Sequence, residues 1–162
     1  MRFIKLAIIS LIVLFLLATS IGLLLPGKVL VSRAVDIQQP ADSILPMLND
    51  LRQWKHWVEG MDQPTVKIKN EKEANLNGVA VRITQSNNKQ IITEWKLRNG
   101  AIQISTINLI QQPNQQTTVQ WQFEQSLKWY PWERLGSMMN DKIIGTMMEK
   151  NLQQLKLYCE VN

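Results

Sequence analysis

The sequence predicts an α+β protein with an N-terminal transmembrane helix, an antiparallel sheet and one long C-terminal helix, in that order. Three observations support this prediction. An uncharged apolar run fills most of the first 27 residues, the middle of the chain alternates apolar and polar residues, and the C-terminal part repeats apolar residues at helical spacing. Alternation is typical of strands with one solvated face, whereas a period near four is typical of helices.

The N-terminal segment carries no charged side chain between Lys5 and Lys28. At about 1.5 Å per residue it is long enough to cross the roughly 30 Å hydrocarbon core of a bilayer. Pro26-Gly27 then ends the helix where the lipid should end. We therefore expect a transmembrane anchor over residues 1–27 and a single domain over residues 28–162.

A cleaved secretory signal would share a basic start, an apolar stretch and small residues such as Ala18-Thr19-Ser20. The apolar character continues from Ile21 to Leu25, so a cleaved chain would begin with an exposed apolar end, which favours an uncleaved anchor. A short tail carrying Arg2 and Lys5 usually stays cytoplasmic. This pattern predicts a single-pass protein of a bacterial inner membrane with its domain on the periplasmic side.

The net charge of +5 is concentrated around the anchor. Arg2, Lys5, Lys28 and Arg33 flank the anchor, and the other 14 of the 18 basic residues nearly balance 13 acidic residues. The domain therefore has no basic stripe, and we expect no nucleic-acid partner. The flanking cations are expected among phospholipid headgroups, so the membrane itself is the predicted partner, while the sequence indicates no particular protein partner.

The chain has one cysteine and one histidine, Cys159 and His56, which excludes an intramolecular disulfide and a four-ligand zinc site of the usual kind. Cys159 is expected to fill apolar space near a helix end. His56, between Trp54 and Trp57, is expected to be a surface or packing residue. No catalytic triad, glycine-rich phosphate loop or inward-facing carboxylate pair stands out, so we predict no catalytic residue, no metal site and no cofactor.

The clearest strand runs from Thr117 to Leu127, where Val119, Trp121 and Phe123 share one parity. Asn99-Gly100 is a strong hairpin signal before it. The same alternation indicates further strands at 28–37, 66–68, 79–83, 91–97 and 101–111.

Two interruptions are expected in these regular elements. The apolar parity shifts between Ile104 and Ile107, which predicts a bulge near Ser105. In the C-terminal helix, Gly136 and Gly145 each weaken the helix by roughly 1 kcal/mol relative to alanine, and a break or kink is expected near Gly145.

Several local patterns resemble one superfamily. Asn49–Trp57 (NDLRQWKHW) is similar to its N-D-L-x-x-W-x-x-W, and Asp141–Gly145 (DKIIG) to its D-K-M-I-G. A departure occurs at Asn77–Ala80, where the family pattern G-x-G-A is only partly present. On these residues the chain resembles a membrane-anchored member of the SRPBCC superfamily, which includes START lipid-transfer domains and polyketide cyclase/dehydrase-like proteins.

The resemblance implies a helix-grip fold, in which a curved antiparallel sheet of six or seven strands surrounds a long C-terminal helix with an apolar cavity between them. Superfamily members bind lipids, sterols, polyketides and other apolar molecules, and a minority are cyclases. The resemblance also implies that Trp54 and Trp57 pack at the cavity mouth. The residues expected to line the cavity are Trp95, Trp121, Phe123, Met139, Ile143, Met147 and Met148.

These expectations favour a membrane-tethered, non-catalytic binder of a hydrophobic small molecule or lipid. Two alternatives stay open: an interaction module with a filled core, held at the membrane, and a cyclase-like enzyme. A third question concerns Trp129-Tyr130-Pro131-Trp132, which could pack on the domain or reach the bilayer, because amphipathic aromatic residues favour membrane interfaces.

Overall fold

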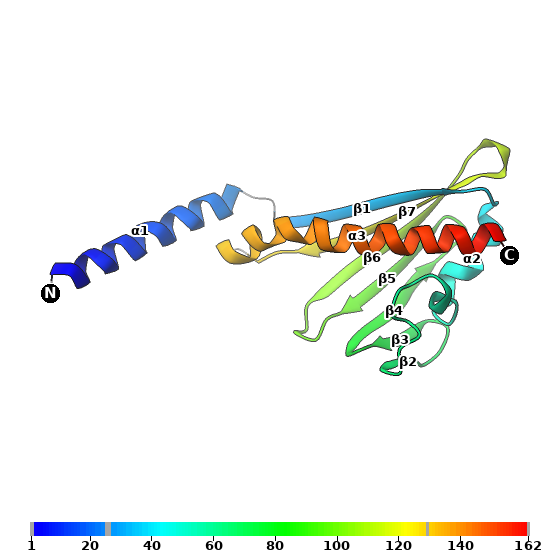
Figure 1. The fold of residues 1–162 in the computed structure, drawn as a ribbon, viewed down its shortest axis with the longest axis horizontal. Coiled ribbons are helices and arrows are strands. Elements are labelled where there is room, and N and C mark those ends of the chain that lie inside the picture. The colour runs from blue at the N-terminus through cyan, green and yellow to red at the C-terminus, as the bar shows by residue number, and fades with distance from the viewer. Residues whose placement is uncertain (1, 25–26, 129, 162) are drawn as a thin grey trace.

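The computed structural model describes residues 2–24, 27–128 and 130–161 of the chain. Figure 1 shows a helix, α1, projecting from a domain in which a curved sheet lies against one long helix, α3. The elements are α1 (Arg2–Leu24), β1 (Lys28–Ile37), α2 (Ala41–Asn49), the 3₁₀ helix η1 (Gln53–His56), β2 (Val66–Ile68), β3 (Glu73–Leu76), β4 (Val79–Ser86), β5 (Gln90–Lys96), β6 (Ile102–Gln111), the 3₁₀ turn η2 (Pro113–Gln115), β7 (Thr117–Ser126) and α3 (Pro131–Val161).

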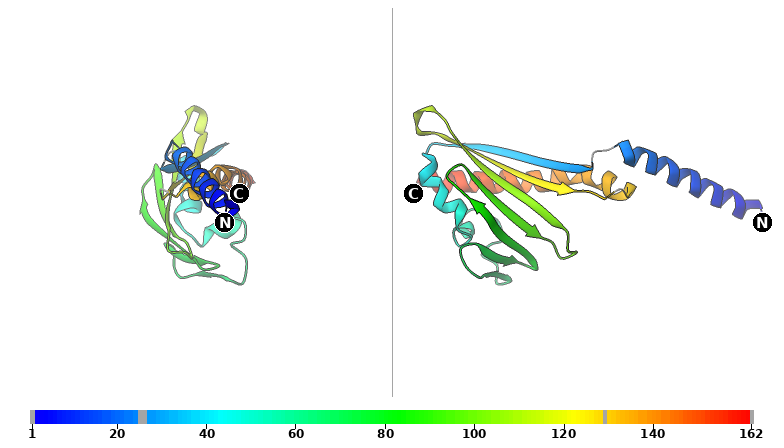
Figure 2. Two further views of the ribbon diagram at one scale, coloured as in Figure 1. Left: turned by 90° about the vertical axis from the view of Figure 1, so that its left-hand side faces the viewer. Right: turned by 180° about the vertical axis from the view of Figure 1, so that it is seen from behind.

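Seven strands form one antiparallel sheet in the described part of the chain, in the order β1-β7-β6-β5-β4-β3-β2. The views in Figure 2 show the sheet curving, with α3 running along its β1 and β7 side. The α+β class, the antiparallel sheet and the long C-terminal helix expected from the sequence are therefore confirmed.

The strand that alternation does not reveal is β3. It has four residues, of which only Ala74 is buried, and Asn77-Gly78 beyond it is a two-residue turn. Both turn residues have positive φ, 53° for Asn77 and 90° for Gly78, as the favoured hairpin turns require. The segment where the sequence departs from the family pattern is thus a regular hairpin between β3 and β4.

The expected bulge near Ser105 is wrong. The β6 register runs unbroken through this residue, with Ser105 opposite Phe123 on one side and Thr93 on the other. Ser105 is a buried polar residue at an inward position, while Ile104 points outward and is exposed, so the apolar parity changes without an extra residue. The irregularity of the sheet lies instead in β4, between Ile83 and Gln85.

The expected break near Gly145 is also wrong, because α3 is one helix from Pro131 to Val161. The guanidinium of Arg33 on β1 lies over Gly145, and a Cβ there would clash with it. Arg33 donates from Nε to Glu149 at 2.6 Å and from Nη1 to Asp141 at 3.3 Å, and these two carboxylates raise the pKa of the guanidinium. Glycine at this position leaves room for an ion-paired arginine between β1 and α3.

Helix α1 is long and apolar enough to cross a membrane, with 22 residues from Phe3 to Leu24. Its apolar side chains are almost all exposed. These properties fit an anchor and equally a signal sequence.

Substitution by alanine should affect the free energy of unfolding differently at Gly136 and at Gly145. Gly136→Ala, where nothing lies within 4 Å of the added Cβ, should raise the free energy of unfolding by about 0.5–1 kcal/mol through helix propensity. Gly145→Ala should give no gain or a loss, because it displaces Arg33. Urea unfolding of the detergent-solubilised chain measures both.

The Arg33→Ala background provides the control for this comparison. Without the guanidinium, Gly145→Ala should become as stabilising as Gly136→Ala. Equal gains from both glycine substitutions in the wild-type background would show that Arg33 does not require the glycine.

Candidate binding site between the sheet and the C-terminal helix

The inner face of the sheet is apolar because one parity of each long strand points toward α3. In β7, Val119, Trp121 and Phe123 are buried, whereas the residues between them are partly exposed. From the other side, α3 contributes Met148 and Leu152, which are likewise buried. The strand assignment made from alternation is therefore confirmed at the centre of the candidate site.

Five aromatic side chains meet in this interior and form a closed ring of contacts, called the aromatic cluster below. η1 and the residue after it supply two tryptophans, β5 supplies one, and β7 supplies a tryptophan and a phenylalanine. The successive centroid distances are 5.2 Å for Trp54–Trp57, 5.6 Å for Trp57–Trp121, 5.5 Å for Trp121–Phe123, 5.4 Å for Phe123–Trp95 and 6.1 Å for Trp95–Trp54.

All four indole N–H groups of the aromatic cluster donate a hydrogen bond. Trp121 donates to Oγ of Ser105 at 2.6 Å, and Trp95 donates to Oγ1 of Thr93 at 2.9 Å. Trp54 and Trp57 donate to main-chain carbonyls of α2, each at 3.0 Å. Buried Ser105 and Thr93 thus have a role, since an unpaired indole N–H would cost about 1–3 kcal/mol.

The aromatic cluster fills the interior near Trp57 and Trp121, which are both buried. Trp95 is only half-buried and marks the side on which the interior meets solvent. Trp54 and Trp57, which the family resemblance assigns to a cavity mouth, are among the most deeply buried side chains.

The predicted lining residues separate into two groups. Trp121, Phe123 and Met148 are buried and Trp95 is half-buried, all at the interface of sheet and helix. Met139, Ile143 and Met147 are exposed instead, by 60%, 65% and 38%, so they lie outside the buried core. Their role as ligand contacts stays a prediction.

These three side chains are exposed because residues that are spaced strictly four apart drift around the surface of a helix. Each step of four turns a helix by about 400°, so successive members move about 40° around its surface. The spacing that stays on one face alternates four and three, and the buried set Met148, Leu152, Leu155 and Cys159 has this spacing.

Asn151 is the buried polar residue on the sheet-facing side of α3. Its Oδ1 accepts a hydrogen bond from the main-chain N–H of Glu59 at 3.0 Å. Its Nδ2 has no protein partner among the described residues. A water or a ligand oxygen would supply the missing acceptor.

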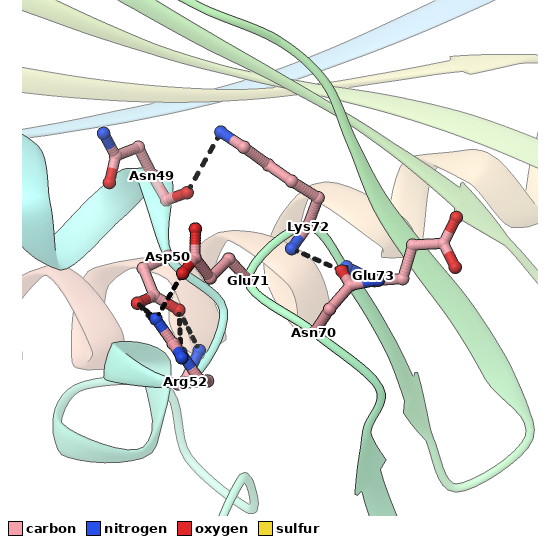
Figure 3. A network of polar contacts seen from close by, with 7 residues as sticks. All are labelled: Asn49, Asp50, Arg52, Asn70, Glu71, Lys72 and Glu73. Carbon is pink, nitrogen blue, oxygen red and sulfur yellow. Dashed lines mark hydrogen bonds and ion pairs between the residues drawn. The ribbon is translucent and has the colours of Figure 1, made fainter.

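A polar network holds the segment that carries Trp54 and Trp57 (Figure 3). Arg52 donates from Nη2 to Asp50 and to Glu71, both at 2.7 Å. The N–H of Leu51 donates to the carbonyl of Glu71 at 2.8 Å, and Lys72 reaches the carbonyl of Asn49 at 3.4 Å. The residues before η1 are thereby fastened to the turn between β2 and β3.

Hydrogen bonds from Arg52 lower the pKa of the Asp50 carboxyl below its ordinary value. The network therefore favours the ionised carboxylate in the folded state. Within the same turn, Oδ1 of Asn70 accepts the N–H groups of Lys72 and Glu73, both at 2.8 Å, which closes the loop that receives Arg52.

The titratable residues give little support to catalysis. His56 is exposed and stacks on Tyr158 with 4.7 Å between ring centroids. Burial raises the pKa of the Cys159 thiol to about 11, so it is protonated at neutral pH. No group of three or more metal-ligating side chains occurs within residues 2–24, 27–128 and 130–161.

Several pockets lie outside the aromatic cluster, and two of them are on the sheet and near the start of α3. The first, of about 520 Å³, is lined by charged residues such as Lys67, Glu73 and Arg82 together with Ala74, Ala80 and Val81. The other, of about 580 Å³, lies near the start of α3 and is lined by Asn99, Gly100, Ala101, Gln125, Ser126, Leu127, Lys128, Glu133 and Gly136.

Comparison with solved structures shows the same fold. A START superfamily protein from Mycobacterium smegmatis has a TM-score of 0.63 and 16% identity, covering 81% of this chain and 97% of that chain. A Nitrosospira multiformis protein gives 0.60 and 13%, over 80% and 94%. A norcoclaurine synthase mutant from Thalictrum flavum, bound to a transition-state analogue, gives 0.57 and 9%, over 79% and 94%.

No protein-family model and no curated protein matches the sequence. Identities of 9–16% show the fold alone. The domain thus has the START/SRPBCC helix-grip fold, with a seven-stranded sheet on a long C-terminal helix, as the local sequence patterns indicated.

Trp121→Ala should lower the free energy of unfolding by about 3–5 kcal/mol, because it removes a buried ring with two aromatic neighbours and a hydrogen bond. Trp132→Ala is the matched control, since this tryptophan is 61% exposed. Chemical denaturation in detergent measures both variants. A Trp121 effect below about 1 kcal/mol would contradict a filled aromatic interior.

The Asp50 carboxylate should make the free energy of unfolding depend on pH. Its pKa is lowered in the folded state, so its contribution is complete above the unfolded pKa of about 3.9 and is lost as pH falls through the folded pKa. The stability difference between wild type and Asp50→Asn should therefore shrink from about pH 6 to about pH 3. Asp62→Asn, at an exposed position, should show a much smaller change.

Proposed function

We propose that this protein is a membrane-tethered, non-catalytic binder of a hydrophobic small molecule or lipid. One observation carries the proposal. Met139, Ile143 and Met147 form a row of exposed apolar side chains in the first half and the middle of α3, although Met148, Leu152 and Leu155 of the same helix are buried. An exposed apolar row beside a largely apolar interior is typical of a binding surface for an apolar molecule.

The filled interior limits where such a molecule would lie. The aromatic cluster occupies the space around Trp57 and Trp121, so the ligand is placed at its open side, against half-buried Trp95 and the exposed row of α3. Methionine side chains are flexible and polarizable, so Met139 and Met147 suit apolar molecules of varied shape. In this proposal the predicted lining residues form two walls of one site.

The tether in this proposal is the segment of residues 1–27, which contains α1, and the domain follows at residues 28–162. Its support is the length and apolar composition of Phe3–Leu24 and the exposure of its side chains. The basic residues before the helix favour a cytoplasmic N-terminus, which places the domain on the periplasmic side of a bacterial inner membrane.

An interaction module is the second candidate, and the aromatic cluster is the observation that favours it. Five rings in mutual contact leave little free space between them, so the fold could serve only to present a surface. A cyclase-like enzyme has less support, because Cys159 is the one titratable residue among the buried positions that the structure describes, and its thiol is protonated.

Replacing the exposed apolar row should weaken binding without unfolding the domain. The double variant Ile143→Gln and Met147→Gln should reduce affinity for an apolar fluorescent probe by about tenfold or more, because it removes apolar contact area. Leu157→Gln, 54% exposed on the same helix, is the matched control and should bind normally. His56→Ala should bind normally as well.

Circular dichroism confirms that each variant is folded before titration, and native mass spectrometry of the extracted chain would identify a co-purifying ligand. Unchanged probe affinity in the folded double variant would refute the proposed site and favour the interaction module.

The tether has its own test. The intact mass of the protein in the membrane fraction should correspond to the uncleaved chain, because apolar residues continue beyond the small-residue segment that ends at Ser20. A mature mass beginning at Ile21 would identify the segment as a signal sequence.

A further inference from the structure

The end of α1 is capped by a residue from α3. The last carbonyls of any helix lack partners within it, and α1 has no basic residue in its own last turn. Arg134 of α3 supplies one, with Nη1 donating to the carbonyl of Gly22 at 2.9 Å and lying 3.5 Å from that of Leu23. A cation at this position also complements the negative end of the helix dipole.

Arg134 belongs to a small group that we call the β7–α3 corner, consisting of Lys128, Tyr130, Trp132 and Arg134. The rings of Tyr130 and Trp132 stack with 4.9 Å between centroids and 6° between planes. Nζ of Lys128 lies 6.0 Å from the Tyr130 centroid. Trp132 is 61% exposed, so this apolar ring is held in a fixed position and faces outward. Trp129 lies outside the described residues.

The depth of the corner follows from the length of α1. Its 22-residue segment from Phe3 to Leu24 is roughly 33 Å long, close to the thickness of the hydrocarbon core. Gly22 and Leu23 therefore lie where hydrocarbon gives way to headgroups, a layer of roughly 5–7 Å on each side. Trp132 is two residues from Arg134, about 3 Å along the helix axis, which places it in the same layer. Figures 1 and 2 show the start of α3 beside the end of α1.

We propose that the β7–α3 corner lies in the phospholipid headgroup layer of the bilayer that α1 crosses, and that it holds the domain in one orientation there. The inference builds on the tether of the proposed function and adds a second membrane contact. Aromatic rings with a polar atom and lysine are the residue types that favour this layer. With Arg134 joining anchor and domain, the chain meets the membrane through a rigid corner rather than through a free linker.

A probe at Ser126→Cys tests this contact in the full chain. Ser126 is exposed at the end of β7, near the corner, and Leu157→Cys provides a reference at the far end of α3. The native thiol, Cys159, is buried, and the labelled parent chain measures its background. Both variants carry an environment-sensitive fluorophore and are reconstituted in phosphatidylcholine vesicles with some phosphatidylglycerol and lipids spin-labelled near the headgroup.

The spin-labelled lipid should quench the Ser126 probe at least about threefold more than the Leu157 probe, since only the former lies at headgroup depth. Adding Trp132→Ser should remove most of that difference, whereas Met139→Ser, 60% exposed two turns further along α3, should not. Circular dichroism confirms that these surface variants are folded.

Equal quenching at both probes, or quenching that is insensitive to Trp132→Ser, overturns the inference while leaving the anchor and the apolar site in place. A chain that does not float with the vesicles overturns the anchor and this inference together. Probe binding to the exposed row of α3 is measured separately, so a failure of the proposed ligand site is distinguishable from both.

Discussion

The contact between Trp57 and Trp121 is the one on which the domain depends, because it joins the helical segment after β1 to the centre of the sheet. Trp57 follows η1, and its indole N–H is fixed on the end of α2. Trp121 lies in the centre of β7 and is fixed on Ser105 of β6. With their rings 5.6 Å apart, the helical segment after β1 is held against the sheet, and α3 closes over both through Met148 and Leu152.

This arrangement gives the two halves of α3 different surroundings. The half toward the C-terminus is buried among the sheet, the aromatic cluster and η1, and its charged residues pair at the rim, as Lys150 does with Glu59 at 2.6 Å. The half toward the N-terminus has exposed apolar residues, contacts α1, and is joined to β1 by the ion pair between Arg33 and Asp141. In the proposed site, an apolar molecule would contact aromatic rings on one side and adaptable methionines on the other.

Sequence reasoning was reliable where a pattern was long and local. Ten residues of alternation located β7 and the burial of Trp121, and the uncharged N-terminal run located α1. It failed where a tertiary partner decided the outcome. In the sequence, the polar Ser105 suggested a bulge, but it is buried because its hydroxyl accepts a hydrogen bond from the indole N–H of Trp121 on the next strand. Gly145 suggested a break in the helix, but a glycine is needed there to make room for the side chain of Arg33.

In the candidate site, too, some residues could be assigned from the sequence and others could not. The buried residues Trp121, Phe123 and Met148 could be assigned from periodicity. The row Met139, Ile143 and Met147 was misleading, because a strict repeat of four drifts around the helix and leaves the buried face. The cap that Arg134 provides for α1 had no sequence signal, because the two residues it joins are more than one hundred positions apart.

The short strand β2 has a consequence for how two copies of the chain can meet. A free sheet edge can pair with the edge of another molecule and so join two sheets into one. The edge formed by β2 offers only three residues, and exposed lysines at positions 67 and 69 lie in and just after it. A brief, positively charged edge repels an incoming strand of the same kind, so the β2 edge is protected against pairing with the β2 edge of a second copy.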